Sequence, residues 1–309
     1  AEMMPLGERG PTIPSVLYLA ADGTMHVGDA ANRHAVTDPS RVAREFKRRL
    51  GDPTPAMVGG QPYPPDALTG ELLRLVYEHV ARTQGGPPQS VTLTHPANWG
   101  TFKRDLLNRA AENAGLAGVS LITEPQAAAI FYASQERVEP GSIVAVYDLG
   151  GGTFDTAVLR KEVDGGFSIL GSPEGLERMG GIDFDEAVFA YVARSLEEFF
   201  EELDPDDEAA VSAVSRLRQE CTQAKEALSA DVEAVIPVRL PNVQTEVRVT
   251  RPELEDMIRP SLTETVTALE RALRSANLST TDVSRVLLVG GSSRIPTVAE
   301  LLSSTLGRP

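Results

Sequence analysis

The sequence predicts an α/β fold with two lobes, and three observations support this prediction. Its 309 residues are enough for two domains of ordinary size, each with a core of its own. Short β-branched runs alternate with stretches in which apolar residues recur at helical spacing. Near the middle, the apolar run 143–147 ends at Asp148, and three consecutive glycines connect it to a second strand-like run. We therefore expect a strand, a tight turn and a returning strand at the centre of the fold.

The glycine-rich turn is the strongest sign of chemistry in the chain. Residues 150–152 lack side chains, so their backbone N–H groups can approach a ligand closely, and an anion is the natural ligand for such groups. Asp148 and Asp155 flank the turn, where two carboxylates can hold a hydrated Mg²⁺ and orient a water. The alternative is an ordinary β-hairpin with a glycine-rich turn. The sequence thus predicts a phosphate site with a metal ion bound through water.

Composition narrows the range of partners and compartments. The formal net charge of −15 argues against nonspecific binding to nucleic acid or anionic lipid, since both need basic patches. No apolar run of about eighteen residues is present, so we expect no membrane span. The first residues lack the pattern of a signal peptide, and the single cysteine, Cys221, rules out an internal disulfide framework. These features predict a cytoplasmic protein.

Downstream of the turn, the pattern predicts an inserted helix–hairpin–helix unit. Residues 206–228 have helical spacing, and residues 232–240 and 243–250 alternate apolar and polar side chains around a Pro-Asn turn. Residues 251–276 then read as one or two helices. Earlier in the chain, the basic stretch 41–50 is predicted to be helical.

Several motifs together resemble one known family. Asp-Leu-Gly-Gly-Gly-Thr-Phe-Asp at 148–155 resembles the second phosphate-binding hairpin of the 70-kilodalton heat-shock protein (Hsp70) chaperones, relatives of actin and the sugar kinases. Four further motifs are similar to that family: Phe-Lys-Arg-x-Leu-Gly at 46–51, Glu-Pro-x-Ala-Ala-Ala at 124–129, Gly-Gly-x-Asp-Phe-Asp at 180–185 and Gly-Gly-Ser-Ser-Arg at 290–294. The resemblance covers nearly the whole chain. It implies the actin-like ATPase fold, with duplicated ribonuclease-H-like lobes and a nucleotide cleft between them.

The resemblance also implies domain boundaries. The first lobe would span 1–138, with an outer subdomain at about 15–88 and a core at about 89–138. The second lobe would span 139–309, with its core at about 139–180 and 261–309 and an outer subdomain at about 181–260. The family's first phosphate loop would precede residue 1 and its closing segment would follow residue 309. Because that loop supplies a carboxylate near the metal, we expect the chain as given to be impaired in ATP hydrolysis.

Residues that match the family's motifs are its implied catalytic set. The Lys47 ammonium would contact the γ-phosphate and the attacking water, although a solvated basic face is the alternative for this stretch. Glu124 would lie beneath the phosphates, bonded to metal-bound water, although an acidic residue also suits a helix N-terminus. Thr153 joins Asp148 and Asp155 in this set, with Asp148 on the metal through water and Asp155 also at the metal.

The implied cofactors are ATP or ADP and Mg²⁺. Backbone or side-chain groups on the phosphate side would come from Gly150, Gly151, Gly152, Thr153, Gly180 and Gly181. Adenosine contacts would come from Lys225, Ser229, Gly290, Gly291, Ser292 and Arg294, whose guanidinium can stack on a purine. Asp183 is predicted to cap the helix that follows Gly181.

Two positions depart from the family pattern. Thr222 stands where a glutamate usually bonds the ribose, and Glu226 stands where an arginine can cover the adenine. Both changes weaken the expectation of tight nucleotide binding.

The resemblance implies a slow chaperone ATPase that acts in the stress response. Its lobe motion would control protein clients held by a separate substrate-binding domain, with co-chaperones or an exchange factor as further partners. The alternative from a different class is a non-catalytic nucleotide sensor or interaction scaffold. A sugar kinase or filament-forming relative fits less well, because neither usually combines the motifs at 124–129 and 180–185 with the helix–hairpin–helix insert.

Overall fold

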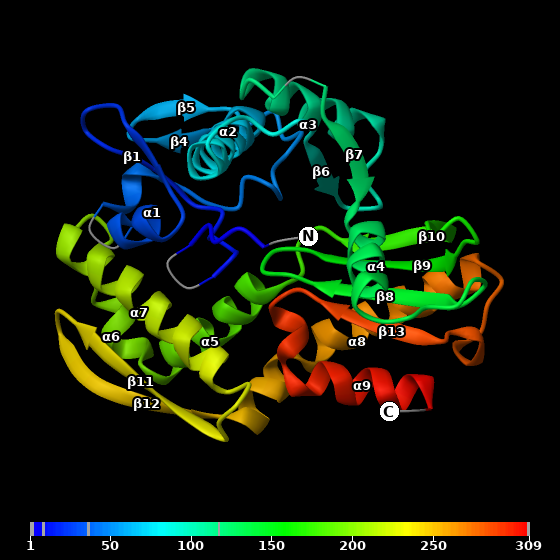
Figure 1. Cartoon of the computed structure of the whole chain (residues 1–309). Helices are drawn as coiled ribbons and strands as arrows, with labels where there is room; N and C mark the ends of the chain where they lie inside the picture. Colours follow the sequence, from blue (N-terminus) through cyan, green and yellow to red (C-terminus); the bar gives the residue numbers. More distant parts are fainter. Residues whose placement is uncertain (1–2, 8–9, 36–37, 117, 308–309) are drawn as a thin grey trace. The chain divides into compact units, whose positions relative to one another are not determined.

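The computed structural model describes residues 3–7, 10–35, 38–116 and 118–307, and it confirms the α/β class (Figure 1). The chain divides into two compact units. The first comprises residues 1–95 and 99–121, and the second comprises 96–98 and 122–309. The boundary predicted at 138/139 assigns residues 122–138 to the first lobe instead, and the predicted lobe limits stay predictions.

Small sheets and two long helices make up the first unit. Strands β1 to β3 form an antiparallel sheet in the order β2-β1-β3. The elements are β1 (Leu17–Leu19), β2 (Met25–Val27), α1 (Asp29–His34), η1 (Pro39–Arg41), β3 (Val42–Ala43), β4 (Ala56–Val58), β5 (Gln61–Tyr63), α2 (Pro65–Gln84), β6 (Thr92–His95) and α3 (Thr101–Asn113), with β7 (Ser120–Thr123) crossing into the second unit. Their apolar residues form several small clusters, one around Leu17, Phe46 and Leu68 and another around Leu50, Trp99 and Leu106.

The helix predicted over 41–50 is wrong. Val42 pairs with Tyr18, and Ala43 pairs with Leu17, so these residues form an edge of the small sheet. Glu45 has φ 56°, a left-handed conformation that no α-helix contains. Residues 46–50 form successive turns, with N–H groups bonded three residues back. Sheet pairing with a distant segment has overridden the local helical preference.

A four-stranded sheet in the order β10-β9-β8-β13 is the centre of the second unit. Its strands are β8 (Ile143–Leu149), β9 (Phe154–Lys161), β10 (Phe167–Leu176) and β13 (Arg285–Val289). Strand β9 is antiparallel to both β8 and β10, whereas β13 is parallel to β8. The predicted strand–turn–strand element is therefore present and forms the middle of the sheet.

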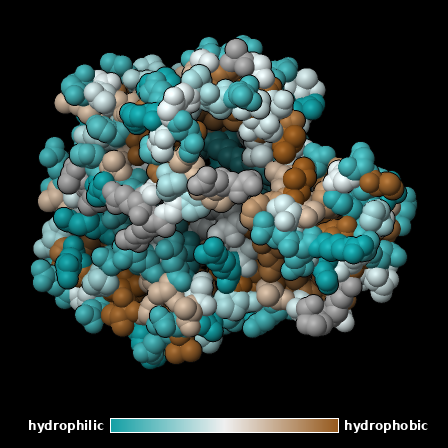
Figure 2. Space-filling model, viewed as in Figure 1, coloured by the Kyte–Doolittle hydropathy of each residue, from teal (hydrophilic) through white to brown (hydrophobic). Residues whose placement is uncertain are grey.

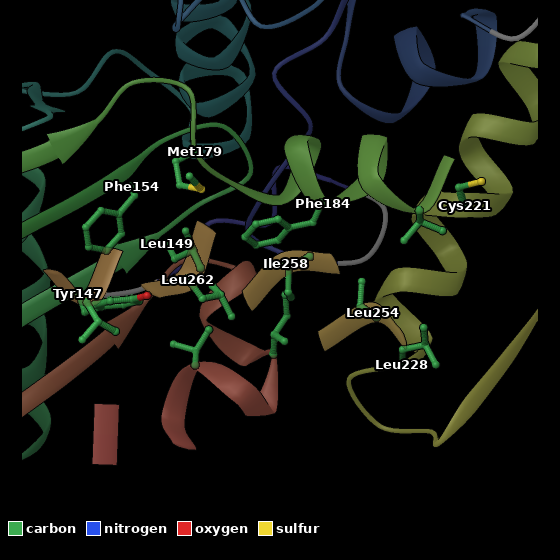
Figure 3. Packing of buried hydrophobic residues seen from close by; sticks show 14 of the residues in the cluster. Tyr147, Leu149, Phe154, Met179, Phe184, Cys221, Leu228, Leu254, Ile258 and Leu262 are labelled. Atoms are coloured by element: carbon green, nitrogen blue, oxygen red, sulfur yellow. The ribbon is translucent and has the colours of Figure 1, made fainter. Parts of the chain in front are cut away.

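Helices cover both faces of this sheet. Because side chains alternate along β8, Val144 and Val146 pack with Ala129 of α4 (Glu124–Gln135), whereas Tyr147 and Leu149 face the opposite side. On that side they join the large cluster formed with α5 (Gly181–Ser195) and α8 (Arg251–Ser275). Figure 3 shows Tyr147, Leu149 and Phe154 directed into this cluster.

The predicted helix–hairpin–helix insert is confirmed. It consists of α7 (Glu208–Ala227), β11 (Glu233–Leu240), β12 (Val243–Thr250) and α8. Helix α8 is continuous through Pro260 and begins with a capping box between Thr250 and Glu253. The remaining elements are α6 (Glu197–Glu201), η2 (Thr280–Asp282), η3 (Ser292–Arg294) and α9 (Pro296–Leu306).

Figure 2 shows mostly hydrophilic residues on the face drawn, with apolar residues between them in small groups. Among the residues that the structure describes, no helix is both long enough and apolar enough to cross a membrane.

Candidate functional site

The turn between β8 and β9 presents bare backbone to open space. Gly150 N donates to Thr153 O at 3.0 Å, which closes the turn. A Cβ placed on Gly151 would meet no atom within 4 Å, and this glycine is exposed. Gly152 and Thr153 are half-buried. A ligand oxygen can therefore reach the turn at Gly151 without meeting a side chain.

Asp148 and Asp155 lie directly opposite each other at the base of this turn. They are cross-strand partners in the β8–β9 ladder, so both side chains project from the same face of the sheet. That face is the one covered by α4, since Asp148 follows Val144 and Val146 at even spacing. Asp155 is 3% exposed. Opposed like charges repel each other, and a cation with its bound waters between them relieves the repulsion.

The pair fits the predicted metal chemistry. Among the described residues, no group of three or more His, Cys, Asp or Glu is arranged to hold a metal ion directly. Mg²⁺ keeps several of its waters and commonly binds through one or two carboxylates plus phosphate oxygens. Asp148 and Asp155 are two opposed carboxylates of the kind that binds such an ion.

The N-terminus of α5 is hydrogen-bonded to the glycine turn between β8 and β9. Gly181 N donates to Gly150 O at 3.0 Å, and Ile182 N donates to Gly151 O at 2.8 Å. A Cβ on Gly180 would lie 2.7 Å from Gly152 N and 2.8 Å from Gly150 O. Gly180 and Gly181 are both buried, so the structure shows them supporting the turn, and their predicted contact with phosphate stays a prediction.

The predicted cap of α5 is wrong. The helix begins at Gly181 with Gly180 as its N-cap, and Asp183 lies in the first turn. The Gly181 and Ile182 N–H groups are satisfied by the glycine turn instead of by a capping side chain.

A second glycine turn, between β13 and η3, is bonded to the first. Gly290 has φ 86°, and a Cβ there would lie 2.3 Å from Leu149 O, so only glycine fits. Ser292 Oγ donates to Gly150 O at 2.9 Å. Ser293 Oγ accepts from Leu149 N at 3.3 Å and donates to Val289 O at 2.5 Å. The turn predicted to hold adenosine is thus connected to the turn predicted to hold phosphate.

Sequence reasoning missed the role of Ser293. The signal was available as a second hydroxyl directly after Gly-Gly-Ser. Of the other residues predicted in this segment, Gly291 and Arg294 are exposed, and a Cβ on Gly291 would meet nothing within 4 Å.

Lys225 reaches the same region from α7. Its Nζ forms an ion pair with Asp185 Oδ1 at 2.7 Å and donates to Gly181 O at 3.2 Å. A Cβ on Gly181 would lie 2.7 Å from Ser292 Oγ and 3.2 Å from Lys225 Nζ, so these groups surround one small space. Sequence reasoning did not identify Asp185 as the partner of Lys225.

Thr222 and Glu226, the two positions that depart from the family pattern, also lie on α7. Thr222 Oγ1 donates to Arg218 O within the helix at 3.2 Å. Glu226 is exposed, and Ser229 is half-buried just beyond the helix end.

Lys47 and Glu124 belong to different units. Lys47 is exposed, in the turns of residues 46–50 of the first unit. Glu124 is the first residue of α4 in the second unit, after Thr123, which accepts from Gln126 N in a capping box. Helix α4 packs on the sheet face from which Asp148 and Asp155 project. That Lys47 and Glu124 meet at the phosphates stays a prediction.

Comparison with known proteins identifies the family. A family model described as Hsp70 protein matches residues 53–309. The chain belongs to the Hsp70 family.

Membership of the Hsp70 family implies the actin-like ATPase fold that the motifs predict. The chain is 32% identical over 308 residues to the chaperone protein DnaK of Methanothermobacter thermautotrophicus, an alignment that covers 97% of this chain and 50% of that protein. It is 30% identical over 315 residues to the chaperone protein DnaK of Thermotoga neapolitana, with 99% and 52% covered. The chain thus spans about half the length of these curated relatives.

In this Hsp70-family chain, the second unit offers separate groups for each part of a magnesium nucleotide. Asp148 and Asp155 suit the hydrated metal, and the open backbone at Gly151 suits a phosphate. The open backbone at Gly291 and the exposed guanidinium of Arg294 suit a nucleoside.

Proposed function

We propose that this chain is part of the ATP-binding and slowly ATP-hydrolysing domain of an Hsp70-like molecular chaperone. The observation that carries the proposal is the pair Asp148 and Asp155, which oppose each other beneath an open glycine turn. The Ser292 hydroxyl bonds that turn to the turn that begins at Gly290, so nucleoside and phosphate groups would bind to one connected unit. Family membership supports the same activity.

Each residue has a defined task in this proposal. Bound Mg²⁺ supplies positive charge that neutralises the phosphate oxygens. Asp148 would hold the metal ion through water, Asp155 would orient the attacking water, and the backbone of residues 150–153 with the Thr153 hydroxyl would receive the phosphates. Lys47 and Glu124 supply a cation and a further acceptor at the reacting phosphate. Such groups act mainly through position and charge, because phosphoryl transfer requires little covalent chemistry from the protein.

The nucleoside side is assigned to Gly290, Gly291, Arg294, Lys225 and Ser229. Gly180 and Gly181 would complete the phosphate side, either by direct contact or through the turn that they support. We further propose that nucleotide exchange moves the two lobes and so controls protein clients in the complete protein. Co-chaperones or an exchange factor, action in the stress response and a cytoplasmic location complete this proposal.

The test is a calorimetric titration of Mg–ADP into this chain. We expect micromolar or tighter binding that Asp148→Ala and Arg294→Ala each weaken at least about tenfold, the loss expected when a charge-assisted contact is removed. Arg248→Ala is the matched control, because Arg248 lies on β12 in an exposed ion pair with Glu233. Absence of heat from a demonstrably folded sample, or equal affinity in all three variants, would contradict the proposal.

A non-catalytic nucleotide sensor is the second candidate function. Its support comes from α7, where the Thr222 hydroxyl bonds within its own helix and Glu226 places a carboxylate in place of the family's guanidinium. Turnover by the complete protein separates the two candidates. An ATPase should lose turnover in Lys47→Ala while it keeps most of its ADP affinity. A sensor should bind ADP without turnover in the unaltered protein.

A further inference from the structure

The loop after β6 brings an asparagine close to Asp155. Residues 96–98 belong to the second unit, although the segments on either side belong to the first. A Cβ placed on Gly175 of β10 would lie 2.3 Å from Asn98 Nδ2, 3.0 Å from Asn98 Cγ and 3.0 Å from Asp155 Oδ1. The Asn98 carboxamide and the Asp155 carboxylate therefore border the same point in space, where a side chain of residue 175 would begin.

Sheet register explains this arrangement. Asp155 pairs with Asp148 of β8 on one side and with Gly175 of β10 on the other. Cross-strand partners project from the same face, so Asp148, Asp155 and Gly175 form one row across three strands. Gly175 is not among the glycines with positive φ, so its backbone conformation does not require glycine. It provides space for a close approach, and Asn98 occupies that space.

We infer that Asn98 is a positioning residue for Asp155. A carboxamide offers two N–H donors and no charge, so it can orient a neighbouring carboxylate without neutralising it. A lysine or arginine in the same place would compete with a cation for Asp155, whereas asparagine leaves the negative charge available. Asn98 is itself exposed, so its carboxamide lies at the surface of the site and not behind it.

The catalytic consequence of this inference depends on the proposed function, but the contact does not. The contact can be tested in this chain labelled with ¹⁵N-asparagine, by NMR of the side-chain amides. The Asn98 pair is identified by its absence in Asn98→Ala. We expect that pair to shift in Asp155→Asn and in Gly175→Ala, whose added Cβ would displace the carboxamide. Asp164→Asn, in the exposed turn before β10, should leave it unchanged. If the chemical shifts of the Asn98 side-chain amide are the same in Asp155→Asn as in the unaltered protein, the inference is overturned.

Turnover by the complete protein tests the role in catalysis. We expect Asn98→Ala to lower kcat about tenfold with KM for ATP within about twofold, the signature of a group that matters mainly in the transition state. Asn98→Asp should lower kcat further, although it is isosteric, because it adds a third carboxylate to the row. Asn113→Ala, at the end of α3, is the control. If Asn98 only filled space, Asn98→Leu, which is neutral and of similar size, would retain full turnover.

The amide spectra and the turnover measurements distinguish a failure of the proposed function from a failure of the positioning role. If the unaltered protein does not hydrolyse ATP, the proposed function fails, while the amide spectra still decide whether Asn98 contacts Asp155. If ATP is hydrolysed and Asn98→Leu matches the unaltered protein, the positioning role is overturned and the proposed function stands.

Discussion

At the scale of single residues, two glycines of the candidate site have opposite surroundings. A Cβ on Gly151 would meet nothing within 4 Å, whereas a Cβ on Gly180 would lie 2.7–2.8 Å from the backbone of residues 150–152. We expect Gly151→Ala to keep the stability of the unaltered protein but weaken Mg–ADP binding, because the methyl group enters ligand space. Gly180→Ala should lower both the stability and the Mg–ADP affinity, since the backbone atoms that its methyl group would meet can move only at a large cost in free energy.

Thermal unfolding and calorimetry on the two variants check this prediction. A loss of stability in Gly151→Ala, or full ADP affinity in both variants, would show that the open side of the turn is not the ligand side. Gly86→Ala is a suitable control, because that glycine also has open space at its Cβ and lies in the first unit.

Gly151 and Gly180 also show how much of the site can be predicted from the sequence. The Asp-Leu-Gly-Gly-Gly-Thr-Phe-Asp pattern predicted the hairpin and its two aspartates, because strand, turn and return are consecutive in the chain. It did not distinguish glycines that face a ligand from glycines that support a turn. Likewise, Lys225 was predicted as an adenosine contact, but its ion pair is with Asp185 of another helix, 40 residues earlier in the chain, and has no local signature.

At the scale of elements, a buried hydrogen bond joins the central sheet to α8. Thr265 Oγ1 donates to Leu262 O, so the Tyr147 hydroxyl is the donor in its 2.5 Å bond to Thr265 Oγ1. Burial raises the pKa of Tyr147 to about 12, so the phenol stays protonated and able to donate. We expect Tyr147→Phe to lower the free energy of unfolding by about 1 kcal/mol and Thr265→Val by about 1–3 kcal/mol, because the valine leaves a buried O–H unpaired.

Urea unfolding of both single variants and the double variant measures this pair. The double variant should be more stable than the sum of the two losses predicts, since removing both partners leaves no unpaired group. Strict additivity would mean that the two hydroxyls do not interact.

The capping box of α8 gives a prediction about pH. Hydrogen bonds from the Thr250 hydroxyl and the Thr250 N–H, and a further one from Tyr191, hold the pKa of Glu253 below its ordinary value of 4.5. A carboxyl whose pKa is lowered by folding stabilises the native state above its unfolded pKa, and this contribution disappears as the pH falls through the folded value. The stability advantage over Glu253→Gln should therefore be constant above about pH 5.5 and shrink below pH 4.5.

Unfolding curves of both proteins between pH 3 and 6 check the sign, at roughly half-unit steps. An advantage that grows on acidification would contradict the assignment. Thr250→Ala should reduce the pH dependence and remove about 1 kcal/mol of stability, because it deletes the capping hydroxyl but keeps the backbone N–H and Tyr191 bonds to Glu253.

Elements were predictable where their signal was local. The hairpin of β11 and β12 follows directly from alternation on both sides of a Pro-Asn turn, and its observed strands agree with the prediction within one residue at each end. Residues 41–50 were predicted wrongly because their conformation depends on a partner strand some 25 residues earlier. The N-terminus of α5 was misassigned for the same reason, since its N–H partners belong to a turn 30 residues upstream.

At the scale of the whole molecule, the two units differ in how their apolar residues are distributed. The second unit contains one large cluster that combines residues of the central sheet, α5, α7, α8 and the β11–β12 hairpin. In the first unit the buried apolar residues form smaller separate clusters. Hydrophobic stabilisation grows with the apolar area buried, so the second unit should be the more stable of the two.

The chain carries its own probe for each unit. Trp99 is the single tryptophan and packs with Leu50 and Leu106 in the first unit. Cys221 is the single cysteine and is fully buried in the large cluster of the second, where burial raises the pKa of its thiol to about 12. The native thiol should not react with an aromatic disulfide reagent, because thiolate is the reactive form and the sulfur is inaccessible.

We therefore expect Trp99 fluorescence to change at a lower urea concentration than the one at which Cys221 becomes reactive. Mg–ADP should move the Cys221 transition to higher urea, because a ligand that binds only the folded second unit stabilises it by mass action. The Trp99 transition should move less, and Asp148→Ala should reduce the shift at Cys221, since it weakens Mg–ADP binding. Coincident transitions would show that the two units unfold as one cooperative domain. A shift confined to Trp99 would place the main nucleotide contacts in the first unit, against the arrangement around Asp148 and Asp155.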